Sequence, residues 1–285
     1  MRAASACAAL TLFLLASIAP AQADDKLWLA SGSPGGTYRD VYAINLGKLL
    51  RGYDVLYHNT SGSGENLDLL AAGEADLAFA QADIYAGRLQ QDSDRYSNIM
   101  VLGKLADECV YVAHRKNGDV QTLAQLGGQV EGRAARIAAG PPGSGSSGTW
   151  SYLTQLDTGL AGASVQPDSG TLALNRLALG GFDAVIWVTD PQNFEHAMLR
   201  AVLTNKDLEL MSLNDPALSN SLEDGTRVYE RKSVPLTDKW NSKKIKTVCT
   251  SAVIFARRDA EPKLTKKVAD LVSLNLSRIV APTTP

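Results

Sequence analysis

Histidine and cysteine are scarce in this sequence, with three of each among 285 residues. None of the histidines, His58, His114 and His196, belongs to a cluster with metal-ligand spacing, and no C-x-x-C or H-x-x-x-H motif occurs. The chain also lacks the G-x-S-x-G turn that carries the nucleophile of many hydrolases. These absences argue against a zinc site and against nucleophilic catalysis. We therefore expect no metal, no cofactor and no catalytic residue, and we interpret each histidine as an incidental surface or core residue.

Neither sign of charge is in large excess. Lys and Arg number 28 and Asp and Glu 30, so the formal net charge is −2. Because no basic cluster occurs, nucleic acid is not an expected partner. Beyond the N-terminal segment, no apolar run is long enough to span a bilayer. With 45% hydrophobic residues, a chain of this length can form two globular domains.

The N-terminal segment has the features of a cleavable signal peptide. Arg2 precedes an apolar run from Leu10 to Ile18, and Ala21-Gln22-Ala23 forms an A-x-A cleavage site. An uncleaved membrane anchor is the alternative, although the run is short for a span of about 20 residues. Cleavage after Ala23 would leave an exported protein with two cysteines, Cys109 and Cys249. In an oxidising compartment these two are a candidate disulfide, and two separate buried thiols are the other interpretation.

A loop rich in glycine and serine, Gly140 to Gly148, lies between an apolar segment and a helical-looking one. Glycine lets the backbone approach a ligand closely, and the serine hydroxyls, the free N–H groups and the dipole of a following helix attract an anion. A flexible linker is the alternative. Two further loops of this chemistry, Ser31 to Tyr38 and Asn59 to Gly64, have similar neighbours. Three such loops favour a ligand site over a linker.

Strand, loop and helix follow one another in two series along the chain. We expect strands at 26–30, 54–58, 77–80, 98–104, 109–114, 136–139, 163–166, 182–189 and 246–256, and helices at 37–50, 65–72, 149–155, 170–179 and 261–279. Consecutive βα units imply parallel sheets with ligands beyond the carboxyl ends of the strands. The sequence therefore predicts two α/β domains.

Two nucleotide motifs overlap the Gly140 to Gly148 loop. The G-x-x-x-x-G frame of a P-loop is present, but Ser146 and Ser147 stand where a lysine and its hydroxyl neighbour are needed. The run Gly143 to Gly148 also satisfies G-x-G-x-x-G, with Asp168 about twenty residues further on, as in dinucleotide-binding enzymes. Pro141 and Pro142 separate these glycines from the preceding strand, which the dinucleotide motif does not allow. A dinucleotide-binding oxidoreductase that uses this loop is the alternative function.

Several stretches resemble the TAXI-type solute receptors of tripartite ATP-independent periplasmic (TRAP) transporters. They are residues 32–38 (GSPGGTY), 60–67 (TSGSGENL), 70–78 (LAAGEADLA), Gln81 and Asp83. Residues 140–146 are similar to the family's second glycine loop, and 247–255 resemble its returning strand. The likeness covers nearly all of the chain after residue 23.

The resemblance implies a two-domain periplasmic binding protein of type II-like α/β fold. Each domain would be a mainly parallel sheet with flanking helices, and the ligand cleft would lie between the domains. Such a protein is a receptor rather than an enzyme: it captures a small solute by closing its domains and delivers it to the membrane subunits of a TRAP-type transporter. The implied segments are a signal peptide at 1–23, domain 1 at 24–108 plus 250–285, and domain 2 at 109–249. We expect a periplasmic monomer.

The resemblance also implies which residues bind the solute. From the first domain these are Gly36, Thr37, Tyr38, Ser61, Ser63, Asn66 and Gln81, and from the second Ser144, Gly145, Ser146, Trp187, Thr189 and Asp190. The family takes glutamate-like and dicarboxylate solutes, so a carboxylate or amino-acid-like solute is expected. Ser147 replaces a common basic residue, which weakens the case for a dicarboxylate, and Asp190 adds a carboxylate that could hold an ammonium group. Large aromatic side chains such as Trp150 leave an apolar ligand open.

In proteins of this fold the chain crosses twice between the domains. The crossings would fall near residues 107–112 and 247–253 of this sequence. Cys109 and Cys249 lie one on each crossing. We therefore expect the two cysteines to be adjacent, and a disulfide between them would brace the hinge.

Overall fold

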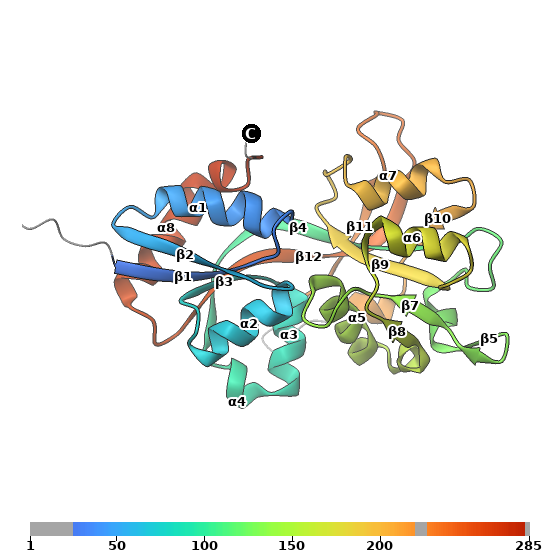
Figure 1. The fold of residues 1–285 in the computed structure, drawn as a ribbon, viewed down its shortest axis with the longest axis horizontal. Helices are drawn as coiled ribbons and strands as arrows, with labels where there is room; N and C mark the ends of the chain where they lie inside the picture. The colour runs from blue at the N-terminus through green and yellow to red at the C-terminus, as the bar shows by residue number, and fades with distance from the viewer. Residues whose placement is uncertain (1–24, 220–226, 283–285) are drawn as a thin grey trace, which may run out of the picture.

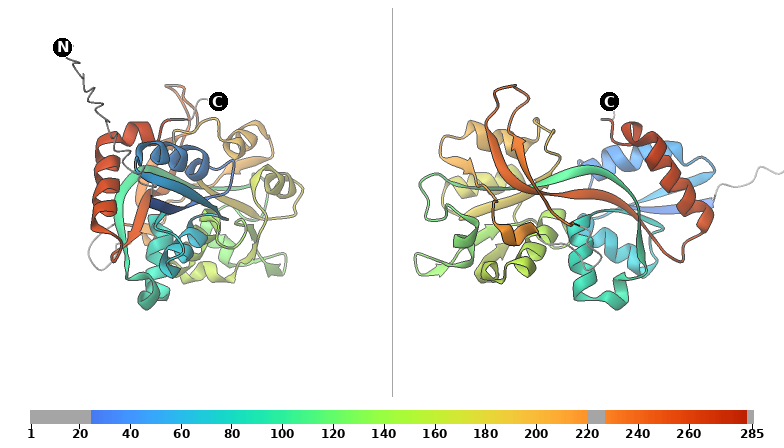
Figure 2. Two further views of the ribbon diagram at one scale, coloured as in Figure 1. Left: turned by 60° about the vertical axis from the view of Figure 1, so that its left-hand side comes forward. Right: turned by 180° about the vertical axis from the view of Figure 1, so that it is seen from behind.

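The computed structural model describes residues 25–219 and 227–282. The expected signal peptide and its cleavage site after Ala23 lie outside the described residues. The molecule has two lobes, and one continuous sheet passes through both of them (Figure 1). Its strand order is β2-β1-β3-β12-β4-β9-β7-β8, with β10 beside β4 and β11 beside β12. β4 (Ile99–Arg115) and β12 (Lys244–Arg257) are the long antiparallel pair that runs from one lobe into the other (Figure 2, right).

We call the half that contains β1 (Asp25–Gly32), β2 (Tyr53–Asn59) and β3 (Leu77–Gln81) the first lobe. β1 pairs in parallel with both β2 and β3, as the βα units predict. The helices cover both faces (Figure 1): η1 (Tyr38–Ala43), α1 (Ile44–Leu49) and α8 (Pro262–Ile279) on one, and α2 (Ser63–Ala72), α3 (Ala82–Gln91) and α4 (Ser93–Tyr96) on the other. Leu264, Val268 and Val272 recur at helical spacing along α8. They are buried in the core between the sheet and the helices η1, α1 and α8.

The second lobe is built around β7 (Arg136–Ala138), which pairs in parallel with β8 (Ser164–Gln166) and β9 (Ala184–Thr189). Its helices are α5 (Gly145–Leu156), α6 (Gly170–Ala178) and α7 (Ala197–Thr204). Shorter elements complete it: η2 (Leu123–Gly127), β5 (Gln129–Val130), β6 (Arg133–Ala134), η3 (Thr158–Gly162), β10 (Leu208–Leu210), η4 (Pro216–Ser219) and β11 (Glu230–Pro235). α5 packs on one face of the sheet through Trp150 and Leu153, and α6 and α7 pack on the other.

The prediction of two separate strands at 98–104 and 109–114 is wrong, because β4 is continuous. Asp107 and Glu108 interrupt the apolar pattern of this segment, yet they pair with Ser251 and Thr250 of β12. The partner strand therefore keeps the segment extended despite its polar residues. The expected helix 37–50 also differs in detail, since it begins as the π-helical turn η1 and continues as α1.

Cys109 and Cys249 face each other in the register of β4 and β12 and form a disulfide, with Cα atoms 3.9 Å apart. Both side chains are buried. The bond closes a loop with a sequence separation of 140 residues, so it joins the two strands at the point where they connect the lobes.

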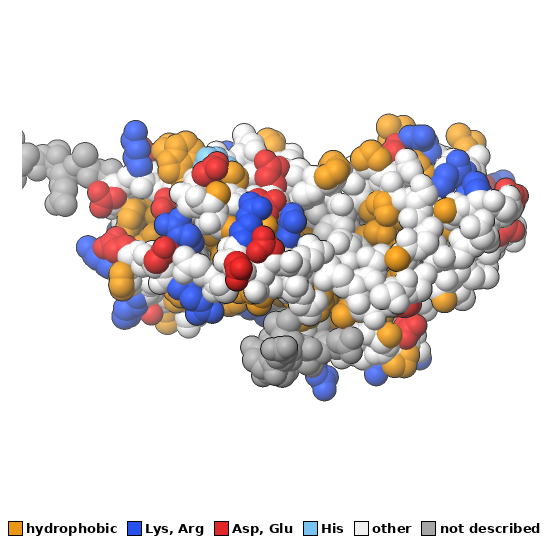
Figure 3. All heavy atoms as spheres, turned by 90° about the horizontal axis from the view of Figure 1, so that it is seen from below, with side chains coloured by type: hydrophobic (Ala, Val, Ile, Leu, Met, Phe, Trp, Pro, Cys, Tyr) orange, Lys and Arg blue, Asp and Glu red, His pale blue; other side chains and the backbone are white. Residues whose placement is uncertain are grey.

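Charged side chains of both signs are interspersed over the first lobe on the face drawn in Figure 3. This mixing agrees with the balanced composition of the chain. Within the part of the chain that the structure describes, no helix is both long enough and apolar enough to cross a membrane.

Candidate functional site

A cavity of about 370 Å³ lies between the two lobes. Most of the expected site residues line it: Gly36, Thr37, Tyr38, Ser61, Ser63, Gln81, Gly145, Ser146 and Thr189. All three glycine- and hydroxyl-rich loops, which are far apart in the sequence, therefore contribute residues to the wall of one cavity. A volume above about 300 Å³ is typical of small-molecule sites.

The loop after β1 presents Thr37 and Tyr38 to the cavity. Gly35 has a φ of +86°, a conformation that favours glycine, and its N–H donates to the Asp40 carboxylate at 2.7 Å. The Gly36 N–H donates to the Ser33 carbonyl at 3.1 Å. These bonds fix a tight turn directly before η1. The ring of Tyr38 consequently reaches the strand β4, where its hydroxyl donates to Glu108 at 2.9 Å.

Glu108 also lines the cavity, although the sequence does not predict it as a site residue. The residue is buried, with only 9% of its surface exposed. Burial and, to a smaller extent, the nearby carboxylates Asp83 and Asp190 raise the pKa of Glu108 to about 7, although the hydrogen bond from Tyr38 opposes this shift. The available signal was its place one residue before Cys109 on a crossing strand, because residues at the crossings border the cleft. Asn193 and His196, which follow β9, also line the cavity and were missed.

The N-terminus of α5 contributes Gly145 and Ser146. Ser144, expected to bind the solute, instead caps the helix: its Oγ accepts the Ser147 N–H at 3.2 Å. Ser144 borders a neighbouring cavity, whereas the next two residues line the cavity between the lobes. α5 has 12 residues, so its dipole adds positive potential at this point of the wall.

The N-terminus of α2 is occupied by the protein's own backbone. The N–H groups of Gly64 and Glu65 both donate to the carbonyl of Gly143, at 3.0 and 3.4 Å. The glycine run Gly143 to Gly148 thus packs against the first lobe instead of forming an open cradle for a pyrophosphate. This arrangement brings the two lobes into contact beside the cavity.

A buried chain of hydrogen bonds crosses between the lobes next to the cavity wall. Gln81 Nε2 donates to Thr149 Oγ1 at 3.1 Å, and Thr149 Oγ1 donates to Asp83 Oδ2 at 2.7 Å. The hydroxyl of Tyr229 donates to the same carboxylate oxygen at 2.6 Å. Burial raises the pKa of Asp83, although the hydrogen bonds from Tyr229 and Thr149 lower it. A wall residue, Gln81, is therefore connected to the contacts that hold the lobes together.

Trp187, Asn66 and Asp190 do not line the cavity, contrary to expectation. Trp187 is buried in the core, with its ring stacked on Tyr111 at 5.5 Å and on His196 at 6.4 Å between centroids. Asn66 is fully buried beneath the wall, where its Nδ2 donates to the Phe79 carbonyl at 2.7 Å. The side chain of Asp190 accepts the backbone N–H of Gln192 at 2.7 Å.

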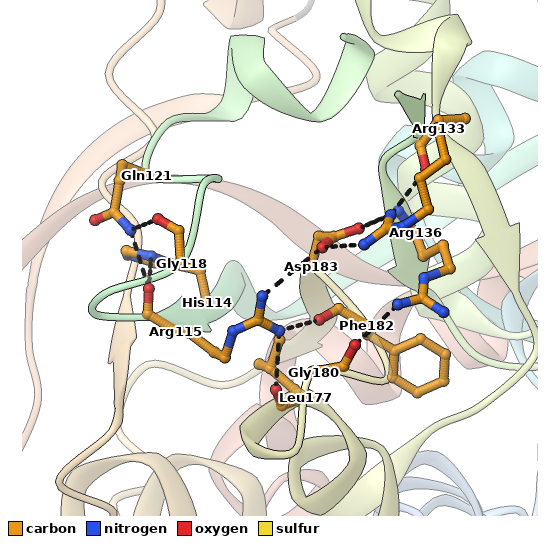
Figure 4. Close-up of polar contacts among 11 residues, drawn as sticks. His114, Arg115, Gly118, Gln121, Arg133, Arg136, Leu177, Gly180, Phe182 and Asp183 are labelled. Carbon is orange, nitrogen blue, oxygen red and sulfur yellow. Dashed lines mark hydrogen bonds and ion pairs between the residues drawn. The ribbon is translucent and has the colours of Figure 1, made fainter. Parts of the chain in front are cut away.

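Three arginines of the second lobe, Arg115, Arg133 and Arg136, form hydrogen bonds within that lobe and do not line the cavity. Arg133 donates to both oxygens of Asp183, at 2.6 and 3.0 Å, and the backbone N–H of Arg136 donates to the same carboxylate at 2.7 Å (Figure 4). Arg115 donates to the carbonyl of Phe182 at 2.7 Å. The described residues that line the cavity include no Lys and no Arg, and the residues that the structure describes hold no group of three or more His, Cys, Asp or Glu arranged for a metal ion.

The fold is similar to that of several solved structures. XAC2383 from Xanthomonas citri, solved bound to ATP, has a TM-score of 0.55 at 13% identity, with 92% of each chain covered. A putative L-cystine ABC transporter from Listeria monocytogenes has a TM-score of 0.52 at 14% identity, covering 90% of this chain and 94% of that one. The GluR0 ligand-binding core from Nostoc punctiforme, in complex with L-glutamate, has a TM-score of 0.51 at 14% identity, covering 89% and 96%. The expected fold class, a two-domain α/β periplasmic binding protein of type II, is confirmed.

Sequence comparison adds the family. No functionally curated protein matches this chain at a significant level. The model of the NMT1-like family matches residues 29–281, from the first strand of the first lobe to the end of its last helix. Because that match spans most of the sequence, the chain belongs to the NMT1-like family.

Proposed function

We propose that this protein is a periplasmic solute receptor of the TAXI type. It would capture a small carboxylate or amino-acid-like solute between its lobes and deliver it to the membrane subunits of a TRAP-type transporter. The observation that carries the proposal is the cavity wall, to which both lobes contribute backbone and hydroxyl groups. Hydroxyl, amide and backbone N–H groups dominate this wall, and such groups suit the binding of a small polar solute.

The TAXI assignment is supported by the motifs that carry the resemblance. Ser33 to Tyr38, Ser61 to Ser63 and Gly143 to Ser146 are separate in sequence but meet around one cavity or directly beside it. A structural neighbour was solved in complex with L-glutamate, and OpuAC of a lactococcus, with a TM-score of 0.50 and 16% identity, was solved closed on glycine betaine. Both of those ligands carry a carboxylate, which fits a wall formed by hydroxyl and N–H donors.

In this proposal β4 and β12 act as the hinge. The domains would be residues 24–108 with 250–285, and residues 109–249, so that each crossing lies next to one half of the Cys109–Cys249 disulfide. A solute that contacts both lobes favours the closed arrangement over the open one and shifts the population accordingly. The chain would be exported by the segment before residue 24 and would act as a monomer.

Three measurements test this function. Native mass spectrometry of the protein purified from periplasm should detect a retained small molecule, and small-angle scattering should show a smaller radius of gyration when that molecule is added back. Proteoliposomes that contain TRAP membrane subunits should then accumulate the solute only when the receptor and an ion gradient are present, without ATP. Uptake that needs ATP, or that proceeds equally without the receptor, would contradict the proposal.

A further inference from the structure

The charge of the cavity is one-sided. Glu108 is an ionisable acid in its wall, and the described wall residues include no Lys or Arg to pair with it. Asp83 and Asp190 lie close enough to Glu108 to act on its ionisation, so the region carries three acid groups. His196, the histidine of the wall, has a pKa lowered by burial and is therefore neutral near pH 7. The described wall residues therefore provide an acid group without a cationic side chain, and a positively charged group on the solute can pair with it.

The carboxylate of Glu108 is fixed in position by Tyr38 and has room for a further hydrogen-bond donor. The residue is more than nine-tenths buried, and its Oε2 accepts the hydroxyl of Tyr38 at 2.9 Å. One hydroxyl does not satisfy a carboxylate, which offers about four lone-pair positions on two oxygens. Glu108 borders the cavity, so a donor on a solute bound there can reach this residue.

The same cavity offers a different chemistry at the start of α5. Gly145 and Ser146 are the first two residues of this 12-residue helix and both line the cavity. The Ser144 hydroxyl accepts the Ser147 N–H. It therefore does not cap the N–H groups of Gly145 and Ser146 in the first turn. Helix N-termini of this kind stabilise carboxylates.

We propose that the solute is a zwitterion whose protonated amine pairs with Glu108 and whose carboxylate lies at the N-terminus of α5. Glu108 is then the residue that selects amino compounds over the corresponding simple acids. The inference rests on the proposed receptor function and narrows its solute class. It differs from a dicarboxylate site, which would require a cation that the described wall residues do not provide.

The direction of the pH dependence follows from the charge. Free Glu108 has a pKa raised by burial to about 7, and an ammonium partner stabilises the ionised form and lowers that pKa. Binding of an amine therefore releases a proton, and affinity increases as the pH rises through 7. The titratable groups that interact with Glu108 are Tyr38, Tyr42, Asp83 and Asp190, and His196 lies in the same cavity wall. If Glu108 instead donated its proton to a solute carboxylate, affinity would decrease over the same pH interval.

The test compares amino acids with their deaminated acids by isothermal titration calorimetry. Suitable pairs are L-glutamate with glutarate, L-alanine with propionate, and L-leucine with 4-methylpentanoate, each at pH 6 and pH 8. The variants are Glu108→Gln, which keeps an acceptor for Tyr38, and Asp107→Asn as a matched control. Asp107 is the neighbouring carboxylate on β4, and its ion pair with Lys104 lies outside the cavity lining.

For at least one pair we expect the amino acid to bind tenfold or more tightly than its deaminated acid, and more tightly at pH 8 than at pH 6. Glu108→Gln should remove this preference and the pH dependence, while Asp107→Asn should retain both. Tighter binding of the deaminated acids, or stronger binding at pH 6, would overturn the inference while leaving the receptor function intact. Both of these results come from the wild-type protein, so they hold even if Glu108→Gln folds poorly. Failure of all amino acids to bind would also overturn the inference, whereas the receptor function is judged separately by the molecule retained from periplasm.

Discussion

The hydroxyl of Thr149 donates a hydrogen bond of 2.7 Å to the carboxylate of Asp83, across the boundary between the lobes. Thr149 is the fifth residue of α5, and Asp83 is the second residue of α3. Both are fully buried. The same hydroxyl accepts from Gln81, whose side chain is part of the cavity wall. A single threonine thus connects the solute site with the contact that closes the lobes.

Replacing Thr149 by valine should weaken this contact with little change in side-chain shape. The variant leaves a buried carboxylate with one hydroxyl donor fewer, which costs about 2 kcal/mol of folding stability. Urea denaturation measures this loss, and Thr154→Val on the same helix is the control, since the exposed Thr154 hydroxyl only donates to the Ser151 carbonyl of its own helix. Equal stability of the two variants would show that the Thr149 contact does not hold the lobes together.

The carboxylate of Asp183 gives a second prediction, which concerns stability and pH. Burial alone would raise the pKa of Asp183, but the hydrogen bonds from Arg133 and the Arg136 N–H lower it below the usual value. Asp183→Asn removes one partner of this ion pair and should destabilise the protein by about 3 kcal/mol at pH 7.

The pH dependence of this difference has a defined sign. A folded pKa below the unfolded value of about 3.9 means that the ionised form is stabilised by folding. The stability contribution is therefore complete above pH 4 to 5 and is lost as the pH falls through the folded pKa. Urea denaturation at pH 7, 5 and 3 should show a constant difference between wild type and Asp183→Asn at the two higher values and a smaller one at pH 3. The exposed ion pair of Asp270 provides the control, because Asp270→Asn should change stability little at any of these values.

The parts of the site that follow from local sequence were predictable. The parts that depend on how a strand residue packs in the folded protein were not. Loops such as Ser31 to Tyr38 are recognisable because glycine and hydroxyl residues at the end of a strand have few other uses. Trp187 was expected in the wall, but its ring packs in the core of the second lobe against Tyr111. Of the β9 residues, only Val188 and Thr189, at its carboxyl end, border the cavity.

Glu108 escaped prediction for a related reason. An acidic residue beside Asp107 looks like part of an exposed turn, and only the pairing of β4 with β12 keeps the segment extended and buries Glu108. The crossing positions of Cys109 and Cys249, by contrast, came from the resemblance to a known fold, and the structure joins these two residues.

Gly145 allows a test of the wall itself. A Cβ at this position would lie 2.1 Å from the Gln81 side-chain oxygen, so Gly145→Ala must displace the Gln81 amide from the cavity and from Thr149. We expect at least a tenfold loss of affinity for the solute retained from periplasm, measured by calorimetry. Gly128→Ala is the matched control, because its nearest neighbour would be the Gln125 carbonyl at an ordinary 3.5 Å. Unchanged affinity in Gly145→Ala would exclude this part of the wall from the solute site.

The disulfide between Cys109 and Cys249 yields the last prediction. It closes a loop with a sequence separation of 140 residues, and cross-linking a loop of this size stabilises a fold by about 4 kcal/mol through the restricted unfolded chain. The double variant Cys109→Ala with Cys249→Ala should lose stability of this order in urea. Dithiothreitol should destabilise the wild type to a similar extent and leave the double variant unaffected, which separates loss of the bond from loss of side-chain packing. The intact wild-type mass under non-reducing conditions should be lighter by two hydrogen atoms than after reduction. Two free thiols in the protein isolated from periplasm would contradict the bond, and the hinge would then depend on the pairing of β4 and β12 alone.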